Sequence, residues 1–327
     1  MKWRSKPSQP PPREGYALPS RTMQRRTLRR RLLRWWREAV AVLVVIVVTT
    51  TAVILINNRE NMPTEQAPES WLDRITVSGN VGRVPTLALT SPISVSATKI
   101  RQLEVGTGRE ITEDSPLIVS ITTFSGEDGR LITAGSRSIM MVGQANTDDF
   151  EATLISGVIG KTEGSRILFL RPVTTDGERT TEINVIDILY SAASGTENPD
   201  PGGPLSVEMT DAGPRASHED GDPPTSLTIQ TLIEGDGQQV HADDSVLVQY
   251  LSANWDDSVV RGSTWSTGIP EAIDLGDAMP GVRNALVDQR VGTRLAITIP
   301  PEQASGDSTL MMVVDIIGTE PRRTDER

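Results

Sequence analysis

The chain has 327 residues, a length that favours two domains, or one domain with appendages, over a single compact domain. Its formal net charge is −11, from 32 basic and 43 acidic residues. It contains no cysteine, which excludes disulfide bonds and acylation of a cysteine, so the folded parts must be stable through packing alone.

The chain begins with a basic tail that is followed by an apolar run. Residues 1–38 contain twelve Lys or Arg residues and two Glu residues, a net charge of +10, so the remainder is strongly acidic. A basic tail alone would suggest nucleic-acid binding, but this one directly precedes the uncharged, mostly apolar residues 39–56. As a helix, that run would span about 27 Å, close to the thickness of the hydrocarbon core. We therefore predict a transmembrane helix over residues 39–56 and no nucleic-acid partner.

The same charges predict the orientation of this helix. Basic residues crowd positions 25–37, whereas Arg59 alone follows the apolar run closely, so the basic tail is expected in the cytoplasm. A cleaved signal peptide is the alternative, but its apolar region is usually shorter and ends at small residues, whereas Thr49–Thr51 is followed here by more apolar residues. We expect a single-pass protein of the cell membrane with its C-terminal domains outside the cytoplasm, behind a polar spacer over residues 57–70.

From about residue 71 onwards the pattern is typical of β-structure. Partly alternating or continuous apolar segments predict strands within residues 86–95, 98–105, 117–124, 166–173 and 182–190. Residues 191–225 are rich in Ser, Gly, Pro and acidic residues, which predicts an interdomain linker that could contribute one strand at residues 205–209.

An internal repeat organises the chain. Apolar residues and glycines of residues 100–121 recur 129 positions later in residues 229–250, among them Gly106 as Gly235. The segment at residues 164–167 recurs 128 positions later, at 292–295, and so does the segment at 186–188. A spacing that stays constant over most of a domain predicts two copies of one fold. We assign them to residues 71–190 and 226–318, followed by a short tail over residues 319–327.

The second copy carries a clear helix signal. Residues 281–289 place Val282, Ala285 and Leu286 on one helical face, and Gly292 lies just beyond as a stop signal. A short amphipathic helix needs a sheet on which to bury that face, which predicts an α+β architecture.

Residues for acid–base, metal or cofactor chemistry are scarce. His218 and His241 have no second histidine beside them for a metal pair, and no serine has an evident histidine partner for a hydrolytic triad. The Gly-X-Gly turns at residues 106–108 and 235–237 precede strands and lack the helix of a phosphate-binding loop. We predict neither a metal nor a cofactor.

A family resemblance supplies the remaining expectations. Between Asp244 and Gly318 the chain reads DSVLVQYLSANW, then MPGVRNAL, VGTRLAITIPP and MMVVDIIG, an order that resembles the FKBP-type peptidyl-prolyl cis-trans isomerases. The resemblance implies two tandem domains, each an antiparallel sheet curled around one short helix. It also implies rotation of X-Pro bonds, whose barrier of about 18–20 kcal/mol can be lowered in an apolar pocket without acid, base or metal. The implied partners are proline-containing exported polypeptides.

The resemblance also implies a substrate pocket in the second copy. The strand Tyr of the family is kept as Tyr250, whereas its helix Trp is Val282 here and its loop Tyr is Ser305. The implied pocket consists of Tyr250, Arg261, Gly262, Ala278, Met279, Val282, Ser305 and Met312, with no residue assigned to catalysis.

The first copy departs further from the family pattern, with Ile121 for the Tyr, Ile132–Thr133 for a Phe-Asp pair and Leu154 for the Trp. Two functions fit these residues. One is a membrane-anchored folding helper with weak isomerase activity in the second copy. The alternative is a non-catalytic FKBP-like binding or spacer module for an exported partner.

Overall fold

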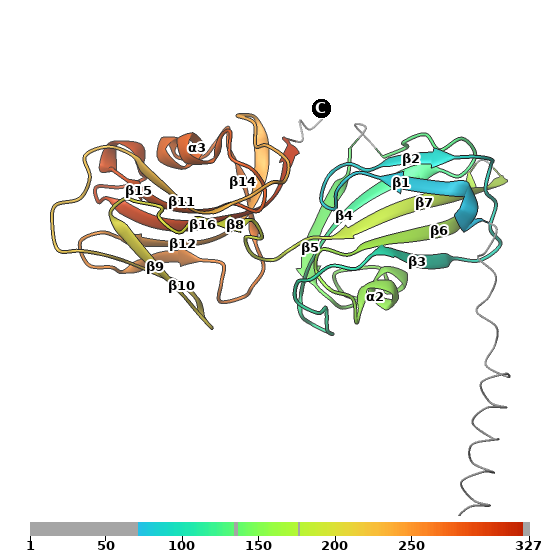
Figure 1. Ribbon diagram of the computed structural model, residues 1–327, viewed down its shortest axis with the longest axis horizontal. Coiled ribbons are helices and arrows are strands. Elements are labelled where there is room, and N and C mark those ends of the chain that lie inside the picture. The colour runs from blue at the N-terminus through green and yellow to red at the C-terminus, as the bar shows by residue number, and fades with distance from the viewer. Residues whose placement is uncertain (1–70, 134–136, 176, 323–327) are drawn as a thin grey trace, which may run out of the picture. The chain divides into compact units, whose positions relative to one another are not determined.

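A computed structural model describes residues 71–133, 137–175 and 177–322. Residues Ser70–Arg327 form one compact unit, which contains two antiparallel sheets built from the two copies (Figure 1). None of the helices in these described ranges is long and apolar enough to cross a membrane. The transmembrane helix predicted over residues 39–56 lies outside the described residues.

The first copy holds a five-stranded sheet and a separate hairpin. The sheet has the order β3-β6-β7-β4-β5, with every neighbouring pair antiparallel. A short 3-10 helix, Leu72–Arg74, precedes the hairpin β1–β2. The bounds are β1 Ile75–Ser78, β2 Thr86–Leu89, β3 Lys99–Glu104, β4 Pro116–Ser125, β5 Ile139–Gln144, β6 Arg166–Thr175 and β7 Glu178–Ile188.

The second copy repeats this arrangement. Its sheet has the order β13-β12-β16-β15-β11-β8, with β14 also paired to β12, and the hairpin β9–β10 stands apart. A 3-10 helix, Pro301–Gln303, lies in the loop before the last strand. The bounds are β8 Thr196–Glu197, β9 Leu205–Thr210, β10 Gly213–His218, β11 Thr228–Glu234, β12 Asp244–Asn254, β13 Val260–Ser263, β14 Glu271–Asp274, β15 Arg294–Ile299 and β16 Leu310–Pro321.

One short helix accompanies each sheet, as the α+β prediction requires. Helix α3, Pro280–Leu286, buries Val282, Ala285 and Leu286 and ends slightly earlier than the sequence predicts. Helix α2, Ala152–Val158, buries Leu154 and Val158 and is the first-copy helix that the family resemblance implies at Leu154, although its local sequence carries no clear helix signal. Its counterpart has Pro at the first helical position, a start signal that α2 lacks.

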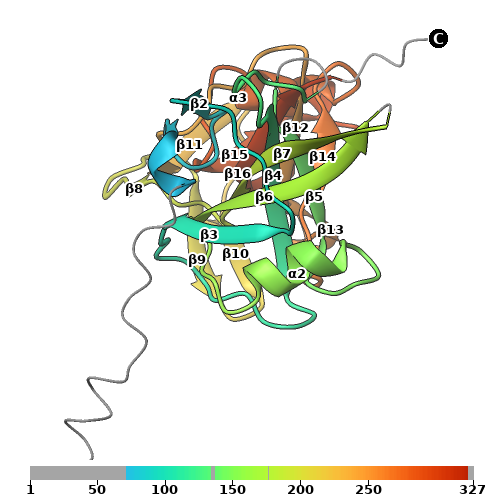
Figure 2. The same cartoon turned by 90° about the vertical axis from the view of Figure 1, so that its right-hand side faces the viewer.

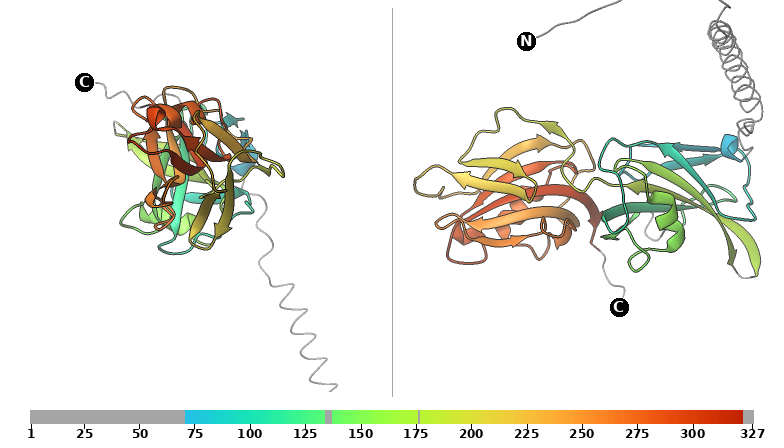
Figure 3. Two further views of the ribbon diagram at one scale, coloured as in Figure 1. Left: turned by 90° about the vertical axis from the view of Figure 1, so that its left-hand side faces the viewer. Right: turned by 90° about the horizontal axis from the view of Figure 1, so that it is seen from below.

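Both faces of each sheet are covered. In the first copy α2 packs on one face, with Ile167 and Ile186, and the hairpin residues Ile75 and Val77 pack on the other (Figures 1 and 2). In the second copy α3 and the hairpin β9–β10 take the same two places (Figure 3). The polar segment predicted as a linker thus contributes β8 to the sheet edge and a hairpin to the core, with β9 at the strand predicted for residues 205–209.

A buried ion pair recurs in both copies. The Arg166 guanidinium donates to both carboxylate oxygens of Asp187, with Nε–Oδ1 and Nη2–Oδ2 distances of 2.7 Å. Arg294 and Asp315 repeat this geometry 128 residues later, at 2.6 and 2.7 Å. Each Asp also accepts a backbone N–H from an earlier segment, that of Gly82 or of Ala193. The sequence repeat therefore preserves a two-pronged ion pair between the same two strands of each sheet.

Close backbone contacts explain why glycine recurs at the corresponding positions 106 and 235 of the two copies. A Cβ on Gly106 would lie 2.0 Å from the carbonyl oxygen of Glu163, and one on Gly235 would lie 2.3 Å from that of Val291. Both glycines therefore allow a strand end to touch the backbone of the turn before β6 or β15.

Candidate binding clefts of the two copies

The pocket residues expected in the second copy divide into a buried group and an exposed group. Val282 and Met312 are 3% and 4% exposed and belong to the apolar core between α3 and the sheet. Tyr250, Ala278 and Met279 pack against that core. The structure therefore brings these five side chains together at one apolar core, with Tyr250, Ala278 and Met279 only partly buried.

Gly262 and Tyr250 also lie together. A Cβ on Gly262 would lie 3.1 Å from the Tyr250 hydroxyl oxygen, so the ring covers this glycine of β13. Burial raises the pKa of Tyr250, and a hydrogen bond to the Glu271 carboxylate and its negative charge raise it further. Tyr250 is thus held as a neutral donor at the edge of the core.

The two remaining expected residues stand apart from this cluster. Arg261 is exposed on β13, where the pairing with β12 is irregular between Ser252 and Ala253. Ser305 is exposed in the loop that follows the 3-10 helix. Neither is part of the buried core formed by Val282 and Met312.

The first copy holds a cavity of about 260 Å³ between α2 and its sheet. Its apolar walls are Ile121, Met141, Leu154, Phe169 and Ile186, and its polar lining is Thr98, Thr123, Glu151, Thr153, Arg171 and Asn184.

This cavity lies where the second copy has its core. At the offsets of the repeat, Ile121 corresponds to Tyr250, Leu154 to Val282 and Asn184 to Met312. Three further lining residues, Thr98, Glu151 and Arg171, likewise correspond to core members of the second copy, namely Leu227, Met279 and Ile299. The same place in the fold is therefore lined by apolar side chains in one copy and by apolar and polar side chains around a cavity in the other.

Two groups of polar contacts equip the first cavity. The Thr123 hydroxyl donates to Asn184 Oδ1 at 2.7 Å, which leaves the Asn184 amide nitrogen as a donor. Arg171 donates to Glu182 at 2.8 Å and to Glu151 at 3.4 Å, and the bond to Glu182 raises the pKa of Arg171. Its Nε atom is buried and donates to no group in the described part of the chain. Unsatisfied donors beside an apolar wall can serve a ligand that carries hydrogen-bond acceptors.

This cavity is not among the sites predicted from the sequence. A signal for it exists in the repeat, because Asn184 and Arg171 stand on strand positions where the second copy has Met312 and Ile299. A polar residue at a position that is apolar in the other copy marks a place that is not packed in the same way.

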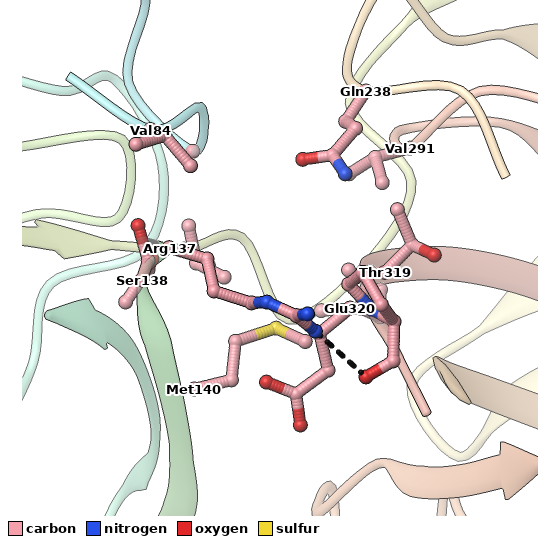
Figure 4. Close-up of a pocket in the computed structure, with 14 residues that line it drawn as sticks. Val84, Arg137, Ser138, Met140, Gln238, Val291, Thr319 and Glu320 are labelled. Carbon is pink, nitrogen blue, oxygen red and sulfur yellow. Dashed lines mark hydrogen bonds between the residues drawn. The ribbon is translucent and has the colours of Figure 1, made fainter. Parts of the chain in front are cut away.

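Two other hollows are weaker candidates for a binding site. One of about 50 Å³ is lined by Arg137, Met140 and Glu320, and there the Arg137 guanidinium donates to the Pro321 carbonyl oxygen at 3.3 Å (Figure 4). A wide and open one of about 620 Å³ lies beside His218, whose ring stacks on Trp255 with centroids 3.8 Å apart. Among the described residues no group of three or more His, Cys, Asp or Glu side chains could hold a metal ion.

The chain is similar to two curated bacterial proteins over a stretch of about one copy. A probable FK506-binding protein of Corynebacterium glutamicum is 27% identical over 106 residues, which cover 30% of this chain and 90% of that protein. An FK506-binding protein of Streptomyces anulatus is 27% identical over 117 residues, which cover 32% of this chain and 94% of that protein. No family model matches the chain.

Solved structures include one similar in sequence. The putative peptidyl prolyl cis-trans isomerase FKBP12 of Mycobacterium tuberculosis is 28% identical, with a TM-score of 0.25 over 31% of this chain and 89% of that one. The three FKBP domains of wheat FKBP73 are 15% identical, with a TM-score of 0.26 over 68% of this chain and 95% of that one. The matches to the curated FK506-binding proteins confirm, over about one copy, the resemblance to the FKBP-type peptidyl-prolyl isomerases that the sequence predicts.

Proposed function

We propose that this protein is a membrane-anchored, FKBP-like binding module for exported polypeptides, in which the second copy serves as scaffold more than as catalyst. The observation that carries the proposal is the burial of two expected pocket side chains of that copy. Val282 and Met312, which were expected to line a prolyl pocket, are almost fully buried against α3 and the sheet. Isomerisation of an X-Pro bond requires the imide itself to enter an apolar pocket that excludes water.

The first copy supports binding in place of catalysis. Its cavity has an apolar wall and a buried donor without a partner among the described residues, Arg171 Nε, which together can hold a chain segment. Its only aromatic lining side chain is Phe169, so it offers little of the rigid aromatic wall that the family uses around the proline.

An isomerisation assay tests the proposal. The full chain in lipid nanodiscs is mixed with a proline-containing peptide, and cis-trans exchange is followed without a coupling protease. We expect a rate close to background at high protein concentration. Fast turnover would overturn the proposal and favour an enzyme.

Weak isomerase activity in the second copy is the second candidate, and Tyr250 favours it. The ring is half-buried beside Gly262 with its hydroxyl on Glu271, which leaves an aromatic surface at the edge of the core. If this candidate holds, Tyr250→Ala lowers the rate more than Tyr190→Ala does. Equal effects of the two substitutions would exclude the second copy as the site.

Membrane anchoring is a separate part of the proposal and rests on residues 39–56. Because the chain has no cysteine, a single introduced cysteine reports its own location without background. We expect a membrane-impermeant maleimide to label intact cells that carry Ser226→Cys, but not cells that carry Ser5→Cys. Labelling of both, or of Ser5→Cys alone, would contradict the proposed orientation.

A further inference from the structure

We propose that the first-copy cavity binds a polypeptide segment by one large, non-proline apolar side chain that has a basic residue nearby. The inference rests on the proposed binding function and names the chemistry of its ligand. It concerns the cavity lined by Ile121, Leu154, Phe169, Asn184 and Arg171. The sequence-based predictions assign no role to this cavity.

The size of the cavity argues for a large side chain. An apolar cavity of about 150 Å³ already accepts benzene, and the ring of proline is smaller than benzene. A proline ring would fill only part of the 260 Å³ in this copy, so it would remove less of the apolar wall from water. A Phe, Leu or Trp side chain fills the space better and removes more apolar surface from water.

The lining argues for a ligand with a peptide backbone. The apolar residues Ile121, Leu154 and Ile186 form one part of the wall, while Asn184 and Arg171 bring hydrogen-bond donors to the same cavity. The Thr123 hydroxyl donates to Asn184 Oδ1, which orients the amide group and leaves its nitrogen as a donor. Arg171 Nε has no hydrogen-bond partner among the described residues. A main-chain carbonyl beside the inserted side chain would satisfy such a donor.

The charges around the cavity argue for a basic neighbour. Glu151 and Glu182 both contact Arg171, so the three side chains carry one net negative charge. The Glu151 side chain is 62% exposed, which leaves its carboxylate open to a ligand in solution. An exposed carboxylate attracts a cation weakly and mainly at low salt, so the apolar side chain supplies most of the affinity.

Peptide titrations test the ligand class. The full chain, with its Ile methyl groups labelled with ¹³C and held in lipid nanodiscs, is titrated with acetyl-Ala-Phe-Ala-Lys-amide. We expect the methyl signals of Ile121 and Ile186 to shift. Replacing Phe by Ala in the peptide should weaken binding about tenfold to a hundredfold, and replacing it by Pro should weaken binding by at least about fivefold. Equal or tighter binding of the Pro peptide, or no shift with the Phe peptide, would overturn the inference.

Two variants test the location. Ile121→Tyr installs the side chain that the second copy has at this position, and Asn184→Met does the same on β7. Each should fill the cavity and reduce binding of the Phe peptide at least about tenfold. The control Ile100→Tyr changes a side chain on β3 that is 40% exposed and does not line the cavity, so it should leave binding unchanged. Wild-type affinity in both cavity variants would overturn the inference even if one of them folded poorly.

A second probe separates the inference from the proposed function. Reduced, carboxymethylated α-lactalbumin is permanently unfolded, and its binding to the full chain measures polypeptide binding in general. If the wild type and Ile121→Tyr bind it equally, the inference falls and the proposed function stands. If the wild type does not bind it while the Phe peptide still shifts Ile121, the inference stands and the proposed function falls.

Discussion

The two copies share a scaffold but differ in what fills the space beneath the helix. Both keep the buried Arg–Asp pair, the glycine that touches the turn, the hairpin on the outer face and one short helix. Beneath α3 the second copy has Tyr250, Met279 and Met312, whereas the first has Ile121, Glu151 and Asn184 beside a cavity. The comparison teaches that the positions required for folding and the positions that shape a cleft can change independently.

The largest effect is expected from breaking the shared ion pair. Asp187→Ala or Asp315→Ala removes the carboxylate that pairs at two points with a buried guanidinium, which should lower the free energy of unfolding by about 3–5 kcal/mol. The loss should be smaller for Asp187→Ala, because Glu104 Oε1 stays 3.7 Å from Arg166 Nη1. Urea-induced unfolding followed by circular dichroism measures this loss. The double variant Arg294→Met with Asp315→Leu removes both charges and should lose much less. If only one copy responded, the two pairs would not be equivalent.

The next effect distinguishes the apolar core of the second copy from the cavity of the first. Met312→Ala removes a side chain that is 4% exposed and should cost about 2–4 kcal/mol of unfolding free energy. Asn184→Ala, at the same position of the first copy, loses the hydrogen bond from Thr123 and should cost about 1 kcal/mol. The same urea titration compares them. Equal costs would mean that the two sites are packed alike.

A smaller effect is expected at the repeated glycines. Gly106→Ala and Gly235→Ala force a Cβ against backbone oxygens, so each should destabilise its copy by about 2–3 kcal/mol. This range lies in the lower half of that expected for Met312→Ala. Gly221→Ala is the matched control because no heavy atom lies within 4 Å of the added Cβ, and it should change stability by less than about 0.5 kcal/mol. Thermal unfolding measures all three variants. A neutral Gly106→Ala would show that the first copy tolerates a wider turn.

The smallest effect is the titration of Tyr250, which has no counterpart in the first copy. Its folded-state pKa lies above the ordinary value of 10.0, so its contribution to stability is present below that pH and is lost as the pH rises through the raised pKa. Ionisation of tyrosine is followed by ultraviolet absorbance in a pH titration. The component of this titration that is lost in the Tyr250→Phe variant should therefore have its midpoint above pH 10. Tyr190→Phe, as a control, should leave this component in place. A midpoint at or below pH 10 would contradict the contact with Glu271.

Much of the scaffold could be predicted from the sequence, because a fold leaves regular traces. The repeat spacing, the strands now found as β4, β6 and β7, and helix α3 all follow from apolar periodicity and turn residues. Helix α2 follows only from the resemblance, because Ala152–Val158 lacks the Pro-Gly start of its counterpart and gives no clear periodic signal. The hairpin β9–β10 is hidden in a polar segment, since each of its strands presents few apolar residues to the core.

The candidate site was less predictable. The resemblance pointed to residues of the second copy. In the structure Tyr250, Val282 and Met312 lie in or against one apolar core. Whether such a face is a cleft or a core depends on side-chain volumes in three dimensions, which a linear pattern does not contain. The cavity of the first copy, at the position of Leu154 and Asn184, arises from several substitutions whose combined effect is visible only after folding.

The buried ion pairs also have a consequence for synthesis. Each Asp lies in the last strand of its sheet, while its partners, Arg166 and Gly82 or Arg294 and Ala193, come earlier in the chain. A ribosome therefore delivers every one of these partners before the carboxylate itself. Until the last strand emerges, burying the arginine would leave it without the carboxylate that pairs with it at two points, which disfavours premature closure of either sheet. The first sheet can close as soon as Asp187 is delivered, well before the second has been translated.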